Sequence, residues 1–389
     1  MSDYVKRTFD NPLRKSQLLG MLDMELTERC NNNCIHCYIN LPADDSCKDR
    51  ELPADKIKVI LKEAASLGCL TVRFTGGEPL LREDFEEIYL FARKQGLKVL
   101  LFTNGTLITP RLADLFARIS PGEKIEVSVY GMSERSYEAV TRSPGTFQAA
   151  MMGMKLLSDR KVPFVVKAAV LPPNKDELDK FEAWASTIPG MNKPPGYSNY
   201  FDLRARRDSE ERNRLIKKLR PSPEEGIKVL SRHRDRYLAA MRLFCIKFMK
   251  APGDKLLSCG SGQRTGYVDA YGHFQPCILL RHPDTIYDLR TGTLREALIE
   301  FFPLLREMKV NNPDYLARCA KCFLHGLCRQ CPGRSWIEHG ILDKPVDYLC
   351  QVAHARALDL GLLQNGEKAW EVEDGRERLN AFVMGGDKI

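Results

Sequence analysis

Short apolar runs rich in β-branched residues alternate with amphipathic stretches over residues 21–203, and this alternation limits the possible folds more than any other feature of the chain. Repeated βα units of this kind are typical of an α/β protein with a parallel sheet. The expected strands are 21–26, 70–75, 98–102, 125–130, 164–171 and 197–203. The expected helices are 53–67, 83–95, 109–118, 133–141, 146–160 and 175–187. The sequence therefore predicts an α/β domain built from six βα units.

The chain has 13 cysteines in 389 residues, a number that needs an explanation. No run approaches the ~18 apolar residues of a membrane span, and the first residues lack the apolar core of a secretory signal. We therefore expect a cytoplasmic protein with no membrane partner. A reducing compartment and an odd cysteine count both argue against a disulfide framework. Metal ligation is the leading interpretation.

The first cysteine motif, Cys30-x3-Cys34-x2-Cys37, directly follows the first expected strand. The intervening asparagines tolerate left-handed turns, so one loop can bring three thiolates to one centre. Structural zinc normally takes four protein ligands, whereas a [4Fe–4S] cluster held by three cysteines keeps one iron open. Zinc with His36 as fourth ligand is the alternative, but it is geometrically awkward because His36 adjoins Cys37. The motif favours an iron–sulfur cluster with an open iron.

The segment Gly76-Gly77-Glu78-Pro79 follows the second expected strand. In this order on βα units, the two motifs closely resemble the radical S-adenosylmethionine (SAM) enzymes. The resemblance implies a partial (β/α)6 TIM-type barrel, a SAM molecule chelated by the open iron, and a GGEP segment that hydrogen-bonds the SAM amino group. It also implies reductive cleavage of SAM to a 5′-deoxyadenosyl radical that abstracts hydrogen from a substrate. Glycines let the backbone approach a ligand closely, and Glu78 is suited to accept a bond from an ammonium.

Weaker matches occur at the ends of other expected strands, the edge at which α/β barrels place their sites. Asn104 and Ser128 resemble family segments that line the adenosine of SAM, although turn chemistry is an equally good interpretation. His36 occupies the position at which the family usually has an aromatic residue packed on adenine. Arg142 and Lys167 are candidates for the SAM carboxylate, but surface charges are the better interpretation.

A second group of cysteines lies in the last third of the chain, where two C-x2-C pairs are only five residues apart. Zinc ribbons separate such pairs by roughly 15–20 residues. The order resembles the SPASM extension of radical SAM enzymes, with one departure: two residues, rather than three, separate the last two cysteines of the dense cluster. The resemblance implies one auxiliary [4Fe–4S] cluster on Cys319, Cys322, Cys328 and Cys350. It implies a second auxiliary [4Fe–4S] cluster on Cys259, Cys277 and Cys331.

The fourth ligand of that second cluster is open at this stage. Cys245, an iron that is open or bound by substrate, and a water or other side chain are the alternatives. Cys47 and Cys69 match no part of the pattern and are expected to be ordinary thiols.

The formal charge of +8 is concentrated in residues 204–236, which hold 12 basic and 6 acidic residues. A solvated helical connector explains this stretch, and a basic lip over an acidic ligand is the alternative. Nucleic acid binding is not expected, because base-reading motifs and interleaved aromatics are absent. The expected parts of the chain are an N-terminal arm (1–20), the radical SAM core (21–203), the connector (204–252), the SPASM domain (253–363) and a loosely docked tail (364–389).

Most characterised SPASM proteins modify peptides or proteins, so the resemblance implies an oxidoreductase-like maturase acting on a ribosomally made precursor peptide. Only 29 residues precede Cys30, too few for a fused leader-recognition domain, so we expect a separate carrier protein to bind any leader peptide. A flavodoxin- or ferredoxin-type donor is expected to supply the electron. A tetrapyrrole (heme-precursor) side-chain oxidase or decarboxylase is the alternative enzyme, and a zinc-stapled binding module is the non-catalytic alternative. No general base is assignable.

Overall fold

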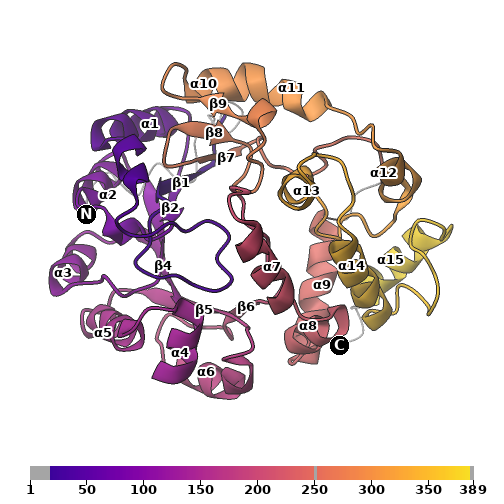
Figure 1. Ribbon diagram of the computed structural model, residues 1–389, viewed down its shortest axis with the longest axis horizontal. Helices are drawn as coiled ribbons and strands as arrows, with labels where there is room; N and C mark the ends of the chain where they lie inside the picture. The colour runs from indigo at the N-terminus through magenta and orange to yellow at the C-terminus, as the bar shows by residue number, and fades with distance from the viewer. Residues whose placement is uncertain (1–17, 249–251, 386–389) are drawn as a thin grey trace. The chain divides into compact units, whose positions relative to one another are not determined.

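The computed structural model describes residues 18–248 and 252–385, so nearly all of the expected N-terminal arm lies outside the described residues. The chain divides into two compact units (Figure 1). The first consists of Met1–Ser198, Ser261–Ile278 and Pro283–Phe302, and the second of Asn199–Gly260, Leu279–His282 and Pro303–Ile389. Each unit thus combines segments that are far apart in the sequence.

A nine-stranded sheet is the framework of the first unit, in the order β6-β5-β4-β3-β2-β1-β7-β8-β9. Neighbours from β6 to β7 are parallel, whereas β8 and β9 are added antiparallel. The strands are β1 (Met21–Thr27), β2 (Thr71–Gly76), β3 (Lys98–Thr103), β4 (Gly122–Val129), β5 (Phe164–Ala169), β6 (Gly196–Ser198), β7 (Thr265–Val268), β8 (His273–Gln275) and β9 (Tyr287–Asp288).

Helices α1 to α6 connect the parallel strands and lie around the outside of the sheet (Figure 1). The α-helices of this unit are α1 (Ala54–Ser66), α2 (Phe85–Lys94), α3 (Pro110–Arg118), α4 (Glu134–Thr141), α5 (Thr146–Asp159), α6 (Leu178–Ala185) and α10 (Leu294–Glu296). Its other helical turns are η2 (Ser46–Arg50), η3 (Pro79–Leu81), η4 (Lys175–Glu177), η5 (Pro283–Thr285) and η6 (Ala297–Phe301). This βα arrangement confirms the α/β fold that the sequence predicts.

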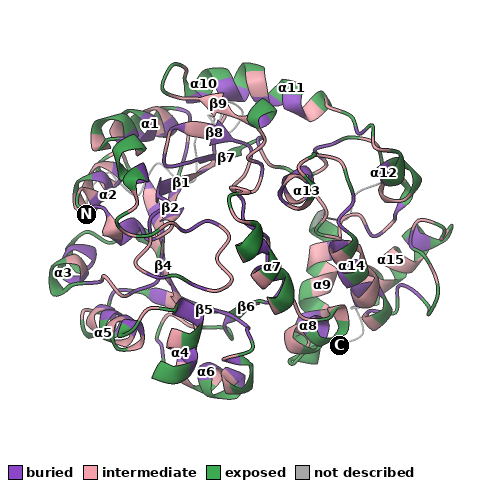
Figure 2. Ribbon diagram, in the orientation of Figure 1, coloured by how far each residue is buried: buried purple, intermediate pink, exposed green. Residues whose placement is uncertain are grey.

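Strand β1 illustrates how the sequence produces the sheet. Leu22, Met24 and Leu26 alternate along it and are almost completely buried. Asp23 lies on the opposite face, where its Oδ2 pairs with Nη1 of Arg73 on β2 at 2.9 Å. Because successive side chains of a strand point to opposite faces, one face of β1 is apolar and the other is polar. Figure 2 shows the same concentration of buried residues along the central strands.

The six predicted strands are confirmed as β1 to β6, with small differences at their ends. Strand β6 is the largest difference, since it covers only Gly196–Ser198 instead of residues 197–203. The chain leaves the sheet at Asn199, whose side-chain Nδ2 donates to Gly226 O at 2.7 Å. The strand therefore ends where the side chain of Asn199 bonds to a residue distant in the sequence.

The sequence pattern does not predict that strands β7 to β9 extend the same sheet. Strand β7 pairs in parallel with β1, with Met21 opposite Thr265. The Tyr267 hydroxyl donates to the buried carboxylate of Glu25. Residues 261–278 and 283–302 consequently belong to the first unit, although the sequence analysis assigns them to the SPASM domain.

The second unit is mainly helical, and its apolar core includes Tyr237, Leu324, Leu327 and Leu360. Leu379, with its neighbours on α15, packs against this core, so the described part of the expected tail is docked on the unit. The helices are α7 (Glu210–Leu219), α8 (Pro223–Leu230), α9 (Arg234–Phe248), α11 (Phe302–Glu307), α12 (Pro313–Ala317), η7 (Cys319–Lys321), α13 (Pro332–His339), α14 (Asp347–Asp359) and α15 (Gly375–Met384). Within the described parts of both units, no helix is long and apolar enough to cross a membrane.

The basic stretch 204–236 is helical, as expected, and forms α7, α8 and the start of α9. Several of its cations are paired inside the second unit. Arg204 Nη2 lies 2.8 Å from Asp208 Oδ2, and Arg220 pairs with Glu338 on α13. Part of the charge excess therefore has a structural role.

Candidate metal centre

The three cysteines of the first motif lie on the loop that follows β1. The base of the loop is closed by two backbone bonds, from Cys30 N–H to Leu41 O (2.9 Å) and from Leu41 N–H to Glu28 O (2.8 Å). Its tip is attached to the end of α4 by a bond from Asn33 N–H to Thr141 O (2.8 Å). Strand and helix together therefore fix the path of the cysteine loop.

The three thiols are close enough for their charges to interact. Burial raises the pKa of the Cys34 thiol well above its usual value, and the charges of Cys37 and Cys30 raise it further. Burial also raises the pKa of Cys30, and the nearby carboxylate of Glu78 adds to that effect. Buried thiols that oppose one another's ionisation need a cation between them to become thiolates. With Cys37, which lies close to both, these thiols make three donors, a number that fits a [4Fe–4S] cluster with one iron lacking a protein ligand.

Gly76 and Gly77 allow the end of β2 to lie directly against the chain that enters the cysteine loop. Gly76 has a φ of +128°, and a Cβ atom there would lie 2.1 Å from Thr27 O. A Cβ atom on Gly77 would lie 2.2 Å from Arg29 O. Both glycines are thus required by the close approach of two loops, in addition to any contact with a ligand.

Glu78 has no exposed surface, and its carboxylate accepts three hydrogen bonds. Oε1 accepts from the Thr103 hydroxyl (2.8 Å) and from Leu80 N–H (3.1 Å), and Oε2 accepts from Asn104 N–H (2.7 Å). Burial raises the pKa of Glu78 to about 7, while these donors act in the opposite direction. The carboxylate thereby joins the loop after β2 to the end of β3, a structural role that the sequence does not predict.

Asn104 connects this network to the cysteine loop. Its Nδ2 donates to Asn31 Oδ1 at 2.9 Å and lies 3.8 Å from Cys30 Sγ. Its Oδ1 accepts the backbone N–H of Thr106 at 2.9 Å. Asn104, a predicted cofactor-binding residue, therefore lies beside Cys30, a predicted metal ligand. The bond from Thr106 N–H to Asn104 Oδ1 holds the Asn104 side chain there.

Tyr130 belongs to this site, but the sequence analysis does not select it. Its side chain acts to lower the pKa of the Cys34 thiol, and Ser128 acts to lower the pKa of Tyr130, although burial raises both pKa values more strongly. The centroid of its ring lies 5.4 Å from the centroid of the His36 ring, and the two ring planes make an angle of 60°. Tyr130 thus contacts both His36 and Ser128. Its position immediately after β4 is the sequence signal that would have identified it.

Arg142 and Lys167 have other local contacts. Lys167 Nζ pairs with Glu126 Oε1 at 2.5 Å and lies over the Phe102 ring, 5.2 Å from its centroid. Arg142 is exposed and ends α4 in a left-handed conformation (φ 52°). These contacts agree with the interpretation of both residues as structural or surface charges.

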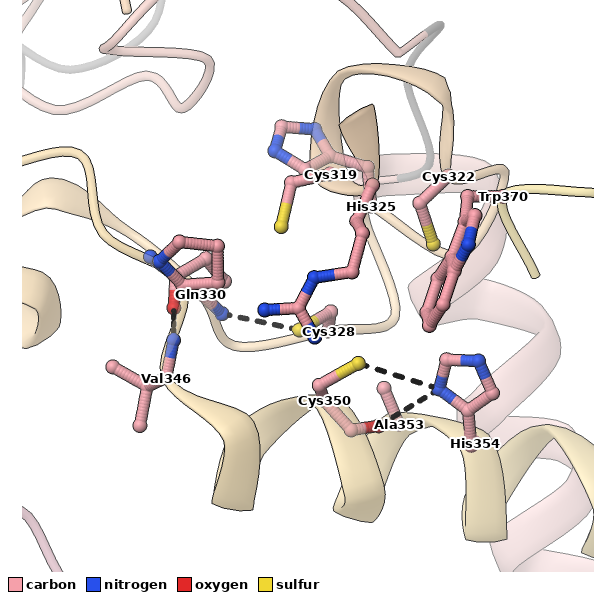
Figure 3. Close-up of a pocket in the computed structure, with 12 residues that line it drawn as sticks. Cys319, Cys322, His325, Cys328, Gln330, Val346, Cys350, Ala353, His354 and Trp370 are labelled. Atoms are coloured by element: carbon pink, nitrogen blue, oxygen red, sulfur yellow. Dashed lines mark hydrogen bonds between the residues drawn. The ribbon is translucent and has the colours of Figure 1, made fainter. Parts of the chain in front are cut away.

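Cys319, Cys322, Cys328 and Cys350 line one cavity of the second unit (Figure 3). They come from η7, from the loop between η7 and α13, and from the first turn of α14. The structure thus brings together the four cysteines that the sequence groups. Among the residues it describes, no three Cys, His, Asp or Glu side chains could hold one metal ion. Thiols spaced around a cavity fit a multi-iron cluster better than a single zinc ion.

The remaining cysteines are less closely grouped. Cys277 follows β8 in the first unit, whereas Cys259 and Cys331 belong to the second, so a cluster shared by these three stays a prediction. In the second unit, Arg334 Nη1 lies 3.9 Å from Cys331 Sγ. Cys245 is a buried residue of that unit's apolar core, which is where an ordinary thiol packs. Two further buried thiols are Cys47 and Cys69.

The βα framework and the cysteine loop held against the GGEP segment define a radical SAM domain, and residues 24–185 match the Radical SAM superfamily. The chain therefore carries a radical SAM domain over these residues. It is 27% identical over 334 residues to the AdoMet-dependent heme synthase of Methanosarcina barkeri, covering 82% of this chain and 93% of that relative. It is 28% identical over 320 residues to the mycofactocin maturase MftC of Mycolicibacterium smegmatis, covering 79% of this chain and 76% of that relative.

Solved structures extend the fold similarity over most of the chain. The structure of native anSMEcpe with bound AdoMet matches with a TM-score of 0.59 and 17% identity, covering 94% of this chain and 99% of the other. SuiB of Streptococcus suis bound to S-adenosylmethionine matches with a TM-score of 0.58 and 14% identity, covering 90% and 83%. The fold is that of a partial TIM-type barrel followed by a SPASM domain.

When bound, the [4Fe–4S] cluster and SAM of a radical SAM enzyme supply the 5′-deoxyadenosyl radical that abstracts a hydrogen atom from the substrate. The chain itself contributes three thiols, of which that of Cys34 is buried, and the loop that holds them. It also contributes the GGEP turn, which Glu78 fixes to the end of β3. The burial of Cys34 and Glu78 keeps water from this side of the site.

Proposed function

We propose that the enzyme oxidatively modifies a ribosomally made precursor peptide. The observation that carries this proposal is the similarity to the mycofactocin maturase MftC over about three-quarters of both chains, 79% and 76%. The same fold occurs in SuiB, whose structure with the precursor peptide SuiA matches this chain with a TM-score of 0.55. Such a fold is therefore compatible with a peptide substrate.

At the first site, Cys30, Cys34 and Cys37 would hold the [4Fe–4S] cluster. The backbone around Gly76 and Gly77 would receive the amino group of SAM, and Glu78 would fix that turn. The adenine would lie near His36 and Ser128, with Tyr130 beside them, and Asn104 would line the adenosine. The short distances among these residues support the assignment.

Two auxiliary [4Fe–4S] clusters complete the proposed set of cofactors. The cavity lined by Cys319, Cys322, Cys328 and Cys350 supports the first of them. Spacing alone supports the second, on Cys259, Cys277 and Cys331. Iron analysis of anaerobically reconstituted protein tests both, since three clusters require about 12 iron atoms per chain and one requires about 4.

The proposed partners follow from this chemistry. A low-potential donor of the flavodoxin or ferredoxin type would supply electrons, and a separate carrier protein would present any leader peptide. Such a reaction needs a reducing compartment, so we place the enzyme in the cytoplasm.

The substrate class is tested by anaerobic incubation with SAM, a reductant and candidate peptides encoded beside the gene. The expected result is a peptide that has lost two hydrogens and an equal amount of 5′-deoxyadenosine. If none of these peptides changes mass while 5′-deoxyadenosine still forms, the peptide proposal fails and the radical SAM chemistry stands.

Oxidative decarboxylation of a heme precursor is the second candidate. It is favoured by the similarity to the M. barkeri heme synthase, which covers 93% of that relative. Iron-coproporphyrin III is the probe, and mass spectrometry would show loss of one formic acid equivalent per reacting propionate side chain. This outcome, with unchanged peptides, would replace the first proposal.

A further inference from the structure

His354 lies on α14 one turn after Cys350 and is held on both sides of its ring (Figure 3). Its Nδ1 lies 2.9 Å from the backbone O of Cys350 and 3.6 Å from Cys350 Sγ. Its Nε2 accepts the backbone N–H of Ala369 at 3.2 Å. The Trp370 ring packs edge-on against it, with ring centroids 5.4 Å apart. The imidazole is therefore fixed in position and orientation.

These partners also determine where the imidazole carries its proton. A backbone N–H can only donate, so Nε2, which faces Ala369, must be the unprotonated nitrogen. The proton of the neutral ring is consequently on Nδ1. It is directed at Cys350, where the carbonyl oxygen and the sulfur share it.

We infer that His354 is a positioning residue that raises the reduction potential of the cluster on Cys319, Cys322, Cys328 and Cys350. The inference rests on the auxiliary cluster proposed above. Hydrogen bonds to cluster sulfurs are one of the means by which a protein sets the potential of an iron–sulfur centre. Reduction adds negative charge to the cluster and its thiolates, so an N–H donor stabilises the reduced form more than the oxidised form.

His325 provides a matched control, because it lines the same cavity without contacting a thiol in this way. Its Nε2 lies 3.2 Å from the Tyr315 hydroxyl. Among the hydrogen bonds of the described residues, none joins His325 to a cysteine sulfur. Replacing either histidine disturbs the packing of the cavity, but only the change at His354 removes an N–H aimed at a cluster ligand.

The experiment is a redox titration of the anaerobically reconstituted full chain, monitored by electron paramagnetic resonance. All proteins carry Cys30→Ala, Cys34→Ala and Cys37→Ala, so that only auxiliary signals remain. The signal of interest is the one lost when Cys319→Ala is added. We compare His354→Leu, which removes the donor, with His354→Asn, whose Nδ2 can replace the imidazole Nδ1.

The expected result is a more negative midpoint potential for His354→Leu, a potential near that of the parent for His354→Asn, and no shift for His325→Leu. An unchanged potential in His354→Leu, or an equal shift in His325→Leu, overturns the inference and leaves the auxiliary cluster in place. If no signal depends on Cys319, the auxiliary cluster itself is refuted, and the inference with it.

A measurement on the parent protein covers the case in which His354→Leu loses its iron. The reduced cluster should show hyperfine coupling to an exchangeable proton, which disappears in D2O and is weakened in a His354→Phe variant that retains iron. Absence of such a proton from the parent protein contradicts the inference without relying on any substitution.

Discussion

At the scale of single residues, Glu78 carries the most unusual chemistry of the first site. A carboxylate with no exposed surface is stabilised only by the groups around it, here the three donors at Thr103, Leu80 and Asn104. Burial nevertheless raises its pKa to about 7. An acid whose pKa is higher in the folded state binds its proton more tightly there than in the unfolded chain.

Glu78 should therefore make the apoprotein less stable as the pH rises from 4.5, its ordinary pKa, to about 7. In this window the unfolded chain gives up the proton while the folded protein retains it, so the free energy of unfolding falls. Glu78→Gln should remove this part of the pH dependence. It should also lower the free energy of unfolding by ~2 kcal/mol at pH 5, because its amide N–H2 group meets the N–H of Asn104. Urea unfolding at several pH values measures both effects.

The exposed Glu83 is the control for this prediction. Glu83→Gln should change the free energy of unfolding by less than about 0.5 kcal/mol and leave its pH dependence unaltered, since the side chain lies at the surface. If the free energy of unfolding changed with pH in the same way in the wild type and in Glu78→Gln, Glu78 would titrate normally in the folded chain and the prediction would be wrong.

Substitution of a first-motif cysteine gives a second prediction at this scale. Cys30→Ala, Cys34→Ala or Cys37→Ala should abolish 5′-deoxyadenosine formation, because a cluster with two thiolates is incompletely held. The auxiliary signals should persist, since their cysteines lie on other segments. Chromatography of SAM products, together with electron paramagnetic resonance, checks both parts. Full 5′-deoxyadenosine production in any of the three variants contradicts the assignment.

The sequence identifies residues whose chemistry is unusual and whose spacing is fixed, such as Cys30 and Gly77. It does not identify Tyr130, because an aromatic residue after a strand is common and nothing local shows that it meets His36. The role of Glu78 is also hidden, since its donors at Thr103 and Asn104 lie on another strand and its loop. Contacts between distant segments depend on the fold and are not encoded in a local pattern.

At the scale of secondary-structure elements, the close contact between the segments that follow β1 and β2 depends on Gly77. A methyl group there would lie 2.2 Å from Arg29 O, which is backbone and cannot turn aside. Gly77→Ala should thus force the two loops apart and lower the free energy of unfolding by about 3 kcal/mol. It should also reduce 5′-deoxyadenosine formation. Thermal unfolding and a SAM cleavage assay provide the measurements.

Gly196→Ala is the matched control, because it also adds a methyl group to a glycine at the end of a parallel strand of the same sheet. There the closest atom to the new Cβ is 3.9 Å away, at Lys167 Cγ. Its effect on stability should be within about 1 kcal/mol. If the two variants were equally stable, the close approach of Gly77 to Arg29 O would not contribute to the stability of the fold.

The six βα units could be predicted because each has a local sequence signal. A run rich in β-branched residues marks the strand, and apolar residues at helical spacing mark the helix. Strands β7 to β9 could not, because they are two to four residues long and occur after a long helical insertion. What makes β7 part of the sheet is its pairing with β1, Met21 opposite Thr265, a nonlocal register. The docking of α15 was similarly hidden, since Leu379 and Phe382 find their partners only in the folded unit.

At the scale of the whole molecule, the first unit is not complete at the end of its sixth strand. A fragment ending at Leu203 lacks β7, so one side of β1 would present unpaired backbone groups. We expect this fragment to aggregate, or to unfold at a lower temperature than the full chain, because exposed strand edges promote association. Size-exclusion chromatography and circular dichroism during heating test this. A monomeric fragment as stable as the full chain would show that the β1–β7 pairing is dispensable.

The pairing of β1 with β7 also has a consequence for biosynthesis. Strand β1 leads into the cysteine loop, yet its second neighbour is made about 240 residues later. At typical rates of translation that is an interval of roughly 10 to 50 s. During this interval the nascent chain exposes both a strand edge and the three thiols of the first cysteine motif. Cluster delivery to the loop is therefore expected after release from the ribosome, and chaperones that shield strand edges should favour correct loading over oxidation of these thiols.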